Sequence, residues 1–500
     1  MRLNAITRVC HIKNGWFMNG AGVKVKKESG IDLTQGKIFG KLLAFILPIM
    51  AANLLQAFYN AADMIVVSLS GEGDAVGAIG TTGTLITLVF SICVSVSIGA
   101  KVVIARALGE GNAEAVRRAV RTAVVTGFLF GILCSGVGLI VAKPALQLLG
   151  NKGKLLDLSV LYTRIYMLGV PFVSLTNFFT AILHGEGNSK TPFVVLVISG
   201  LINVALNLFF VLVCKMTVDG VALATVISNG VSAVVLLVVL MRENTLCKVV
   251  LRELRIYKDS FVKMLEIGIP AALQTTAFTV SNMLIQSSII KVNDMLVGPD
   301  VEYQPVVKGN SVSTSIESFL YTAAASIGQA SVSFVGQNAG AKKYDRIKRG
   351  MIILYAISFI VPSLFAGAVI LLRDPILALY GIPHVESGLE KIAYDAALSR
   401  MLLMFIPYFT LGFMELGSGM MQGFGRALTA AVCTLTGACV FRIIWIFTVF
   451  AADPTLDAIY ISYPISWALT SAAHFVMATI TLKKLKKRAA ADEELQRQSA

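Results

Sequence analysis

The sequence predicts an all-α integral membrane protein, with twelve transmembrane helices arranged in two pseudo-symmetric six-helix bundles. Its 500 residues are 56% hydrophobic and only 14% charged, which is typical of a chain held mostly in lipid. Apolar windows recur along the whole chain, and each can cross a hydrocarbon core of ~30 Å as a helix of about 20 residues. The windows do not alternate at period two, as the strands of a membrane barrel would.

The first six windows define an N-terminal bundle, which we place at residues 39–241. In chain order they span 42–71, 75–100, 119–142, 158–183, 191–214 and 220–241. A polar and basic linker at 242–263 separates them from a second bundle at 264–482. Its windows span 267–290, 309–341, 350–372, 401–425, 427–452 and 458–482. Every window is free of charge or carries a single charge, as a membrane helix requires.

The positive charge is distributed unevenly along the chain. The formal net charge is +14, and most of the 43 lysines and arginines fall in the two tails and in alternate loops. This positive-inside pattern predicts that the tails 1–38 and 483–500 are both cytoplasmic, in an inner or plasma membrane. The basic runs KKYDRIKR (342–349) and KKLKKR (483–488) then lie beside anionic headgroups. We therefore expect membrane lipid, and no nucleic acid, as the partner of this charge.

Cysteine and histidine usage argues against a structural metal. The 7 cysteines and 4 histidines are scattered without metal-ligand spacing. Most of the cysteines fall inside apolar windows, where a thiol behaves as a small hydrophobic group. The opening stretch MRLNAITRVCHIKNGWFMNG is too polar for the core of a signal peptide. We expect no cofactor and no metal other than a coupling sodium ion.

The two halves repeat each other in motif order. Windows 42–71 and 267–290 both carry an early proline followed twelve residues later by an asparagine, and the tripeptide SIG occurs in the second window of each half. HGEGN (184–188) corresponds to QGFGR (422–426). Because each half has six helices, the halves face the same way and are related by an axis along the membrane normal. Two such halves enclose a cleft, which suits alternating access.

These segments resemble those of the multidrug and toxic-compound extrusion (MATE) family of secondary transporters. The residues that carry the resemblance lie in family order over roughly residues 35 to 485: LPIMAANLLQAFYNAAD (47–63), ILHGEGNSKTP (182–192), INVALN (202–207), ALATVIS (222–228) and GQNAGAKKYDR (336–346). The resemblance implies two six-helix bundles around a large central cavity. It also implies the exchange of sodium or protons for organic, often cationic, compounds.

One full charge, Asp63, lies inside the first apolar window. A charged side chain at the bilayer centre costs ~2.5–3.5 kcal/mol on insertion scales, so such residues usually serve a function. Asp63 lies past the middle of the window, fifteen residues beyond Pro48. It either touches water near the outer end of the helix or faces the interior of the bundle. In the interior it can exchange a proton for a cation, because low dielectric favours the neutral form of a carboxyl group.

Neutral oxygen donors offer partners for Asp63. Asn203 and Asn207 are four residues apart and therefore share one face of a helix. The resemblance implies a cation-coupling site made by Asp63, Asn177, Asn203, Asn207 and Thr225. Asn207 departs from the family pattern, in which an aspartate is common, so the choice between sodium and proton stays open. The asparagines can alternatively serve only as interhelical hydrogen-bond partners, worth ~0.6 kcal/mol on average.

The second half has intramembrane acids of its own. Glu317 and Glu415 can pair with a cationic substrate or carry a proton, and either can instead form a structural ion pair with Arg400 or Arg442. We expect the substrate cavity to be lined by acidic and adaptable apolar side chains: Glu415, Glu317, Phe178, Phe179 and Met414. Aromatic faces attract organic cations, although phenylalanines on membrane helices more often face lipid or neighbouring helices.

Four prolines lie inside apolar windows, where each removes a helical hydrogen bond and permits a bend. They are candidate hinges for alternating access, and static kinks are the alternative: Pro48, Pro171, Pro270 and Pro407.

The sequence thus predicts a secondary antiporter and not an enzyme. We expect a monomer that exports a small organic, cationic compound in exchange for sodium or protons. A flippase for lipid-linked sugars is an alternative, but it would need an arginine-rich cavity for the pyrophosphate. A membrane-embedded enzyme is disfavoured because the sequence has no HExxH or GxSxG motif. A channel is disfavoured because no ring of charges repeats.

Overall fold

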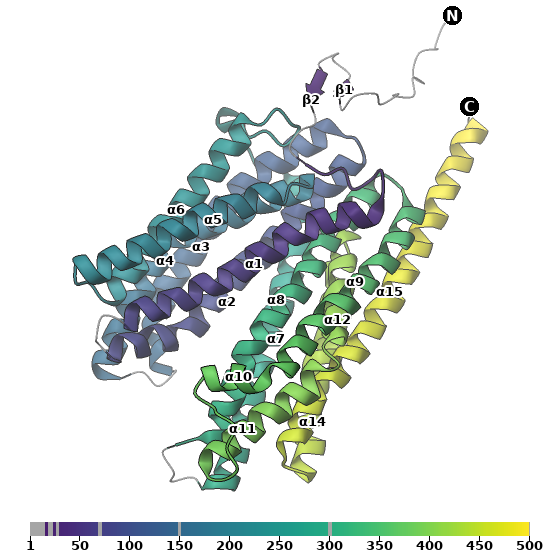
Figure 1. The fold of residues 1–500 in the computed structure, drawn as a ribbon. Coiled ribbons are helices and arrows are strands. Elements are labelled where there is room, and N and C mark those ends of the chain that lie inside the picture. Colours follow the sequence, from purple (N-terminus) through teal and green to yellow (C-terminus); the bar gives the residue numbers. More distant parts are fainter. Residues whose placement is uncertain are drawn as a thin grey trace, which may run out of the picture.

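The structure is a computed structural model that describes residues 16–18, 24–26, 30–68, 73–148, 152–298 and 303–499. These residues are almost entirely helical (Figure 1). Within them, the one sheet pairs two short antiparallel strands, β1 (Trp16–Met18) and β2 (Lys24–Lys26), with Phe17 opposite Val25.

The first half of the chain forms helices that overlap the first six predicted windows. Apolar segments become helices because lipid cannot satisfy backbone N–H and C=O groups, and a helix satisfies them within the segment. The helices are α1 (Ile38–Ser68), α2 (Gly73–Gly109), α3 (Ala113–Leu148), α4 (Gly153–Glu186), α5 (Lys190–Leu208) with its π-helical extension η1 (Phe209–Val213), and α6 (Val218–Arg242). The linker contains one 3₁₀ turn, η2 (Leu251–Glu253).

The second half repeats the pattern with more interruptions. Its helices are α7 (Lys258–Val297), α8 (Pro305–Gly340), α9 (Tyr344–Leu371), α10 (Arg373–Leu379), α11 (Leu389–Arg400), α12 (Phe409–Gly423), α13 (Ala427–Thr434), α14 (Phe441–Trp445) and α15 (Leu456–Ser499). The π-helical segments η3 (Met401–Phe405), η4 (Leu435–Val440) and η5 (Ile446–Phe450) join neighbouring helices. The all-α membrane fold that the composition predicts is confirmed.

By length and apolar composition, nine of the described helices can cross a membrane, or ten if the bent pair Leu389–Phe405 and Phe409–Gly423 counts as one span. α7 and α8 are not among them, since polar residues such as Gln274, Thr275 and Asn310 interrupt their apolar faces. The total of twelve spans therefore stays a prediction.

Equivalent turns in the two halves show the predicted pseudo-symmetry. After α2, the N–H groups of residues 110, 111 and 112 donate to carbonyls four, three and five residues back. After α8, residues 341, 342 and 343 repeat the same pattern. Gly111 and Lys342 both adopt positive φ there, at 70° and 55°. The two halves thus end corresponding helices with the same backbone geometry.

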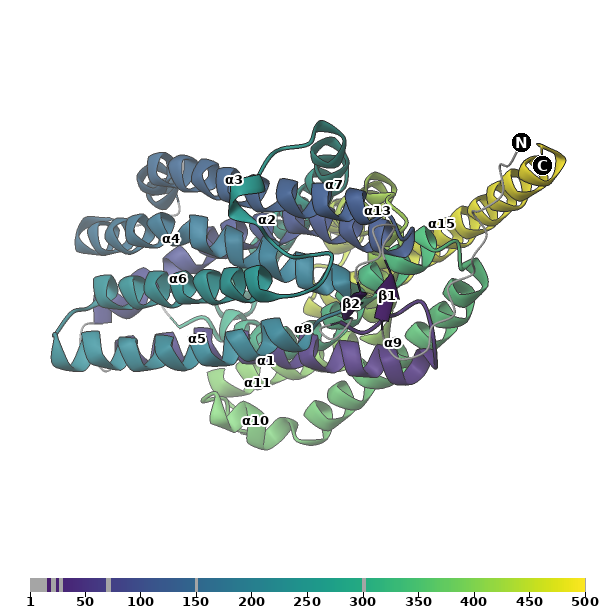
Figure 2. The same ribbon diagram turned by 90° about the horizontal axis from the view of Figure 1, so that it is seen from above.

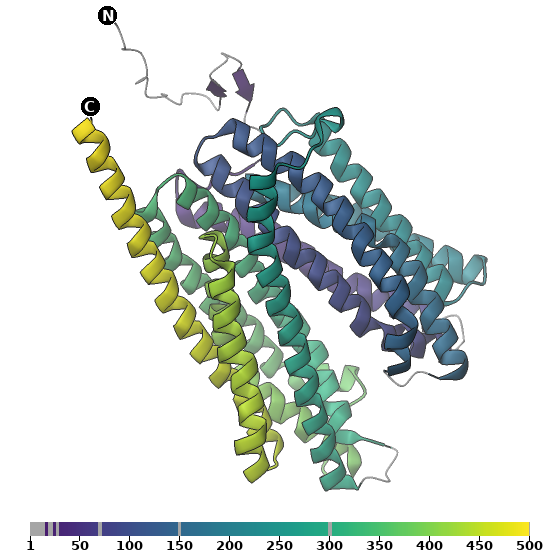
Figure 3. The ribbon, with the colours of Figure 1, turned by 180° about the vertical axis from the view of Figure 1, so that it is seen from behind.

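The two bundles lie side by side, meet at the end that carries the start of α1 and the end of α15, and diverge toward the other end (Figure 1). Figure 3 shows the same arrangement from behind, and Figure 2 shows from above that α3, α4, α6 and α5 follow one another across the first bundle. Helices α1 and α2 pack on α8 and α7, respectively. Asn53 donates to the Ser326 hydroxyl at 3.0 Å, and the Ser95 and Thr275 hydroxyls lie 3.1 Å apart. Gly99 lies against the carbonyl group of Met264.

A short segment ahead of α1, residues 30–36, joins the bundles at their common end, and we call it the N-terminal strap. The Ile31 N–H donates to the Gly187 carbonyl, at the end of α4, at 2.9 Å. The Leu33 side chain is 0% exposed, and the Leu33 N–H donates to the Gln337 side-chain oxygen on α8 at 3.2 Å. The strap therefore contacts both bundles.

Arg346 of α9 fixes the strap to the second bundle. It donates three hydrogen bonds of 2.7–3.0 Å to strap carbonyl oxygens, those of Leu33, Gln35 and Gly36. Gln337 also crosses directly to the first bundle, donating to the Gly185 carbonyl at 2.8 Å. Such donors are needed because buried carbonyl groups require partners. We call this end of the molecule, where the strap, Gly185 and Gln337 meet, the closed end.

The four prolines differ in their local geometry. Pro48, Pro171 and Pro270 lie inside α1, α4 and α7, which continue through them without a break in the helix. Pro407 lies between η3 and α12, where the two parts of the span meet at 51°. A bend is therefore present at Pro407, and the hinge role of all four prolines stays a prediction.

Candidate functional site

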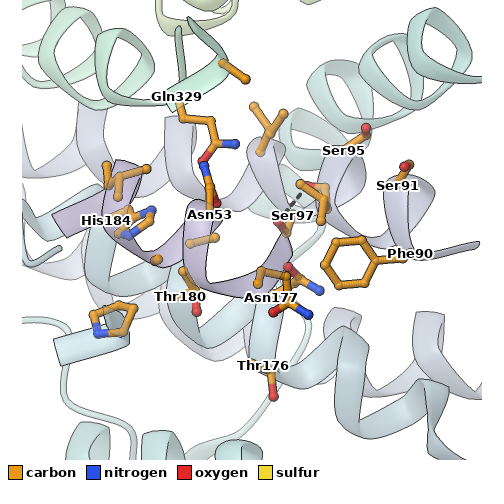
Figure 4. A pocket seen from close by; sticks show the side chains of 18 of the residues that line it. Asn53, Phe90, Ser91, Ser95, Ser97, Thr176, Asn177, Thr180, His184 and Gln329 are labelled. Carbon is orange, nitrogen blue, oxygen red and sulfur yellow. Dashed lines mark hydrogen bonds between the residues drawn. The ribbon is translucent and has the colours of Figure 1, made fainter. Parts of the chain in front are cut away.

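A cavity of about 510 Å³ lies between the bundles, and both bundles contribute to its walls. Its volume is in the range of pockets for small organic molecules. Figure 4 shows the polar side chains of one part of the wall: Asn53, Ser91, Ser95, Ser97, Thr176, Asn177, Thr180, His184 and Gln329. Polar groups are costly in the apolar phase unless partnered, so their convergence marks a hydrated or ligand-filled space.

Close packing of α1 on α5 sets the first side of the site. Gly200 of α5 lies against the ring of Tyr59, and any side chain at position 200 would overlap that ring. The Tyr59 hydroxyl donates to the Val197 carbonyl at 3.3 Å. Asp63 follows Tyr59 by one helical turn, and Asn207 follows Gly200 by about two turns. The absence of a side chain at Gly200 therefore brings the faces that carry Asp63 and Asn207 together.

The predicted coupling residues form a connected network there. Asn207 donates its side-chain N–H to Asp63 Oδ1 at 2.6 Å and to Asn203 Oδ1 at 3.2 Å. Asn203 in turn donates to the hydroxyls of Thr225 and Ser228 of α6, both at 3.4 Å. Four of the five residues predicted for cation coupling thus meet in space, and Ser228 is a member that the sequence did not predict.

Asn207 leaves one strong acceptor unused. The Asn207 side chain is 0% exposed, and its Oδ1 atom has no hydrogen-bond partner among the residues that the structure describes. A buried amide oxygen without a partner costs ~1–3 kcal/mol, and here it lies beside a carboxylate. Amide, hydroxyl and carboxylate oxygens are the ligands of hard cations. The described residues contain no cluster of three or more His, Cys, Asp or Glu side chains, so a cation here would depend on the neutral oxygens.

Asn177 lines the same cavity but lies outside this network. Its side chain donates to the Val173 carbonyl of its own helix, α4, at 2.9 Å. In this conformation Asn177 is part of the cavity wall. Among the described residues, no hydrogen bond links it to Asp63. Its predicted role in coupling is left to functional tests.

Two predicted substrate-cavity residues, Glu415 and Met414 of α12, line the cavity from the second bundle. Within the described part of the chain, no hydrogen bond or ion pair joins the Glu415 carboxylate to another side chain. An unpaired carboxylate in a cavity wall attracts a cationic ligand. Glu415 is therefore a second acidic group, besides Asp63, that faces the space between the bundles.

Glu317, Phe178 and Phe179 do not line the cavity, contrary to the prediction. Glu317 pairs with Arg400 of α11 at 2.5 Å; the Arg400 side chain is buried and the Glu317 side chain is 14% exposed. Phe178 and Phe179 are 0% and 1% exposed in the core of the first bundle. Gly127 of α3 lies against the Phe178 ring, so the aromatic pair fills the contact between α3 and α4.

Sequence reasoning missed several lining residues on helices predicted to be uniformly apolar. Lys101 of α2 is 5% exposed and lines the cavity. Gln274 of α7 and Gln329 of α8 line the opposite wall. The available signal was the spacing of Ser97 and Lys101, because residues four apart lie on one face of a helix.

Known proteins match the chain along most of its length. The MatE family model matches residues 48–209 and 270–448, one segment in each half. The probable multidrug resistance protein YoeA of Bacillus subtilis is 26% identical over 410 residues, covering 80% of this chain and 85% of that protein. The FAD transporter of Shewanella oneidensis is 21% identical over 399 residues, covering 79% and 84%.

The fold also matches solved structures. One, described as the outward-facing conformation of a multidrug resistance MATE family transporter of the MOP superfamily, aligns with a TM-score of 0.82 and 19% identity. The alignment covers 92% of this chain and 99% of that chain. At such low identity, the likeness concerns the fold alone.

Proposed function

The chain belongs to the MatE family of multidrug efflux transporters, and from this premise we propose that it is a secondary antiporter in which Asp63 couples the export of an organic compound to the entry of sodium or protons. The antiporter lies in the cell membrane with both termini cytoplasmic, in keeping with the positive-inside pattern of the sequence. The closed end is then the cytoplasmic end, and the cavity is accessible from outside.

One observation carries this proposal: Asn207 donates to the Asp63 carboxylate, while the Asn207 side-chain oxygen has no partner in the described part of the chain. The carboxylate and the amide oxygen together form a partial coordination shell that a bound sodium ion would complete, with Thr225 and Asn203 nearby. A proton on Asp63 would let the carboxyl O–H donate to that amide oxygen, but it would engage none of the other oxygens, whereas sodium binds several oxygens at once. The donor set therefore favours sodium, with protons as the alternative.

Coupling follows from competition in a shared cavity. Asp63, Asn203 and Thr225 line the cavity that would hold the substrate. A cation that neutralises Asp63 lowers the affinity of the wall for a positively charged substrate, and the substrate lowers the affinity for the cation by the same factor. Glu415 supports a cationic substrate, since it offers a second unpaired carboxylate on the opposite bundle.

A flippase for lipid-linked sugars receives less support. Recognition of pyrophosphate calls for clustered arginines. The described residues that line the cavity include one lysine, Lys101, and no arginine. Arg400 and Arg442 lie in the interior of the second bundle, where they contact aromatic rings.

The proposal is tested in proteoliposomes with one gradient imposed at a time. A fluorescent organic cation should be transported when an inward sodium gradient, or an inward proton gradient, is the only driving force. Asp63→Asn should reduce gradient-driven transport at least about tenfold, because the group that binds the cation has lost its charge. Asp157→Asn, an exposed carboxylate on α4, is the matched control and should transport normally. Transport that ignores both gradients, or normal transport by Asp63→Asn, would refute the mechanism.

A further inference from the structure

Lys101 is a buried lysine that neither the ion site nor the fold accounts for. Its side chain is 5% exposed and lines the central cavity. In the described part of the chain, no hydrogen bond or ion pair joins its ammonium group to another side chain, and burial is the one influence found on it. Lysines are almost never buried without a partner, because removing an unpaired charge from water costs several kcal/mol. Such a residue calls for a ligand of opposite charge.

The position of Lys101 is at the closed end of the cavity. Its backbone carbonyl lies against Gly185, the residue whose own carbonyl accepts the hydrogen bond from Gln337. The neighbouring His184 packs edge-on against Phe45 of α1, with ring centroids 5.9 Å apart. Lys101 is thus part of the innermost wall, on the first bundle.

The acidic groups of the cavity lie farther from the closed end. Asp63 follows Phe45 by eighteen residues on α1, which is about 27 Å along a helix at 1.5 Å per residue. The Glu415 backbone lies against Gly328 of α8, next to Gln329. The cavity therefore carries opposite charges along its length. The ammonium group of Lys101 lies at the closed end, and the carboxylates of Asp63 and Glu415 lie toward the middle and the open end.

We propose that Lys101 is an anion subsite of the cavity, and that the transported compound carries an acidic group, a carboxylate or a phosphate, in addition to its cationic part. The acidic group binds the ammonium of Lys101 while the cationic part faces Glu415. The inference rests on the proposed transport function, since it defines the substrate of the same cavity. It narrows that substrate from any organic cation to an amphoteric compound.

Chemistry supports this pairing. A hydrogen bond between an ammonium and a carboxylate or phosphate is among the stronger ones in proteins, and it strengthens where water is excluded. A purely cationic compound would instead be repelled from the closed end.

The test uses two dyes that differ only in the acid group, tetramethylrhodamine with a free carboxylate and its methyl ester. Binding to the full-length protein is measured by fluorescence anisotropy in phosphatidylcholine nanodiscs, without any ion gradient and without anionic lipid. Lys101→Gln should lower the ratio of acid affinity to ester affinity at least about tenfold, which is the size expected for losing one hydrogen bond to a charged group. Lys101→Arg should keep the ratio within about threefold of the wild type.

Lys143→Gln is the matched control, because Lys143 is an exposed lysine on α3 away from the cavity, and its ratio should equal that of the wild type. An equal ratio in wild type and Lys101→Gln, or an equal fall in both affinities, would overturn the proposal. Thermal unfolding of the ligand-free protein gives a second measurement: Lys101→Met should raise Tm, because an unpaired buried charge is removed. A lower Tm would mean that the lysine has a structural partner, and the proposal would again fail.

These results are independent of the coupling mechanism. A protein that binds the acid through Lys101 but transports without regard to sodium or protons would uphold the subsite and refute the role of Asp63. A protein that couples transport to sodium or protons but binds both dyes equally would uphold the role of Asp63 and refute the Lys101 subsite.

Discussion

The side-chain amide of Asn207 donates a 2.6 Å hydrogen bond to the carboxylate of Asp63, and so joins α5 to α1 inside the membrane. The oxygen of the same amide is buried, and none of the described residues donates a hydrogen bond to it. One neutral residue thus orients the acid and keeps an acceptor available beside it. The hydrogen bond stabilises the ionised carboxylate, which burial alone would disfavour.

We expect the residue at position 207 to set the cation affinity of the site. Asn207→Leu should weaken sodium binding about tenfold or more, since it removes a ligand and the donor to a charged group. Asn207→Asp should strengthen it, because a second carboxylate beside Asp63 adds negative charge. Isothermal titration with sodium chloride against choline chloride measures both changes. Asn112→Leu, an exposed asparagine ahead of α3, should leave sodium affinity unaltered; equal affinities in all four proteins would exclude Asn207 from the site.

We expect Gly200→Ala to destabilise the first bundle by ~1–3 kcal/mol, because the new methyl group would overlap the Tyr59 ring and push α1 from α5. The double variant Gly200→Ala with Tyr59→Ala should recover part of that loss, since the ring is no longer there. Thermal unfolding in detergent gives the comparison. The control is Gly136→Ala on α3, where a side chain meets nothing within 4 Å and should be neutral or slightly stabilising. If Gly200→Ala unfolds at the same temperature as the wild type, then α1 and α5 pack less closely than described.

The pair Glu317–Arg400 gives a prediction about stability in the second bundle. Arg400→Met should cost ~3 kcal/mol, because it leaves the mostly buried Glu317 carboxylate, 14% exposed, without its ion-pair partner. Replacing both residues, as Arg400→Met with Glu317→Leu, should restore much of the loss. Unfolding free energies of the singles and the double give the coupling energy directly. Lys486→Gln breaks an exposed pair with Asp345 and should cost less than ~1 kcal/mol. Similar costs for the buried and exposed pairs would contradict the assigned burial.

The N-terminal strap gives a prediction about conformation. Arg346→Ala removes three hydrogen bonds to the strap and should favour opening of the closed end. Spin labels placed at Lys190 and Lys348, both exposed and on opposite bundles at this end, report the opening in a background without other accessible cysteines. Double electron–electron resonance should then show a larger fraction of long distances. Arg349→Ala, on an exposed part of α9, is the matched control; a distribution unaltered by Arg346→Ala would mean that the strap does not hold the closed end.

Much of the candidate site was accessible from the sequence. The charge of Asp63 inside an apolar window, the four-residue spacing of Asn203 and Asn207, and a family resemblance together predicted a cluster that the structure contains. The repeat was also visible in the order of the motifs. In the structure, the second glycine of HGEGN and of QGFGR adopts a positive φ, 95° at Gly187 after α4 and 72° at Gly425 after α12. These features are local or depend on regular helix geometry.

Other assignments depended on which way a helix faces. Phe178 and Phe179 were expected in the cavity, yet they fill the contact with α3, since Gly127 leaves room for a ring there. From the sequence, Glu317 could either bind a ligand or form an ion pair with Arg400. The packing of α8 on α11 brings Glu317 and Arg400 together, which decides for the ion pair. Lys101 received no role from the sequence because a lone lysine near a predicted helix end is usually solvated.

By itself the sequence determined the membrane-embedded helices, their order and the relation between the two halves. Hydrophobic length and the need to satisfy the backbone within each segment suffice for that, and both are properties of the local chain. Only the tertiary structure decided which polar groups meet, which face the cavity and which remain without partners. The reason is that rotation of a helix about its axis is fixed by contacts such as Gly200 with Tyr59, which join residues far apart in sequence.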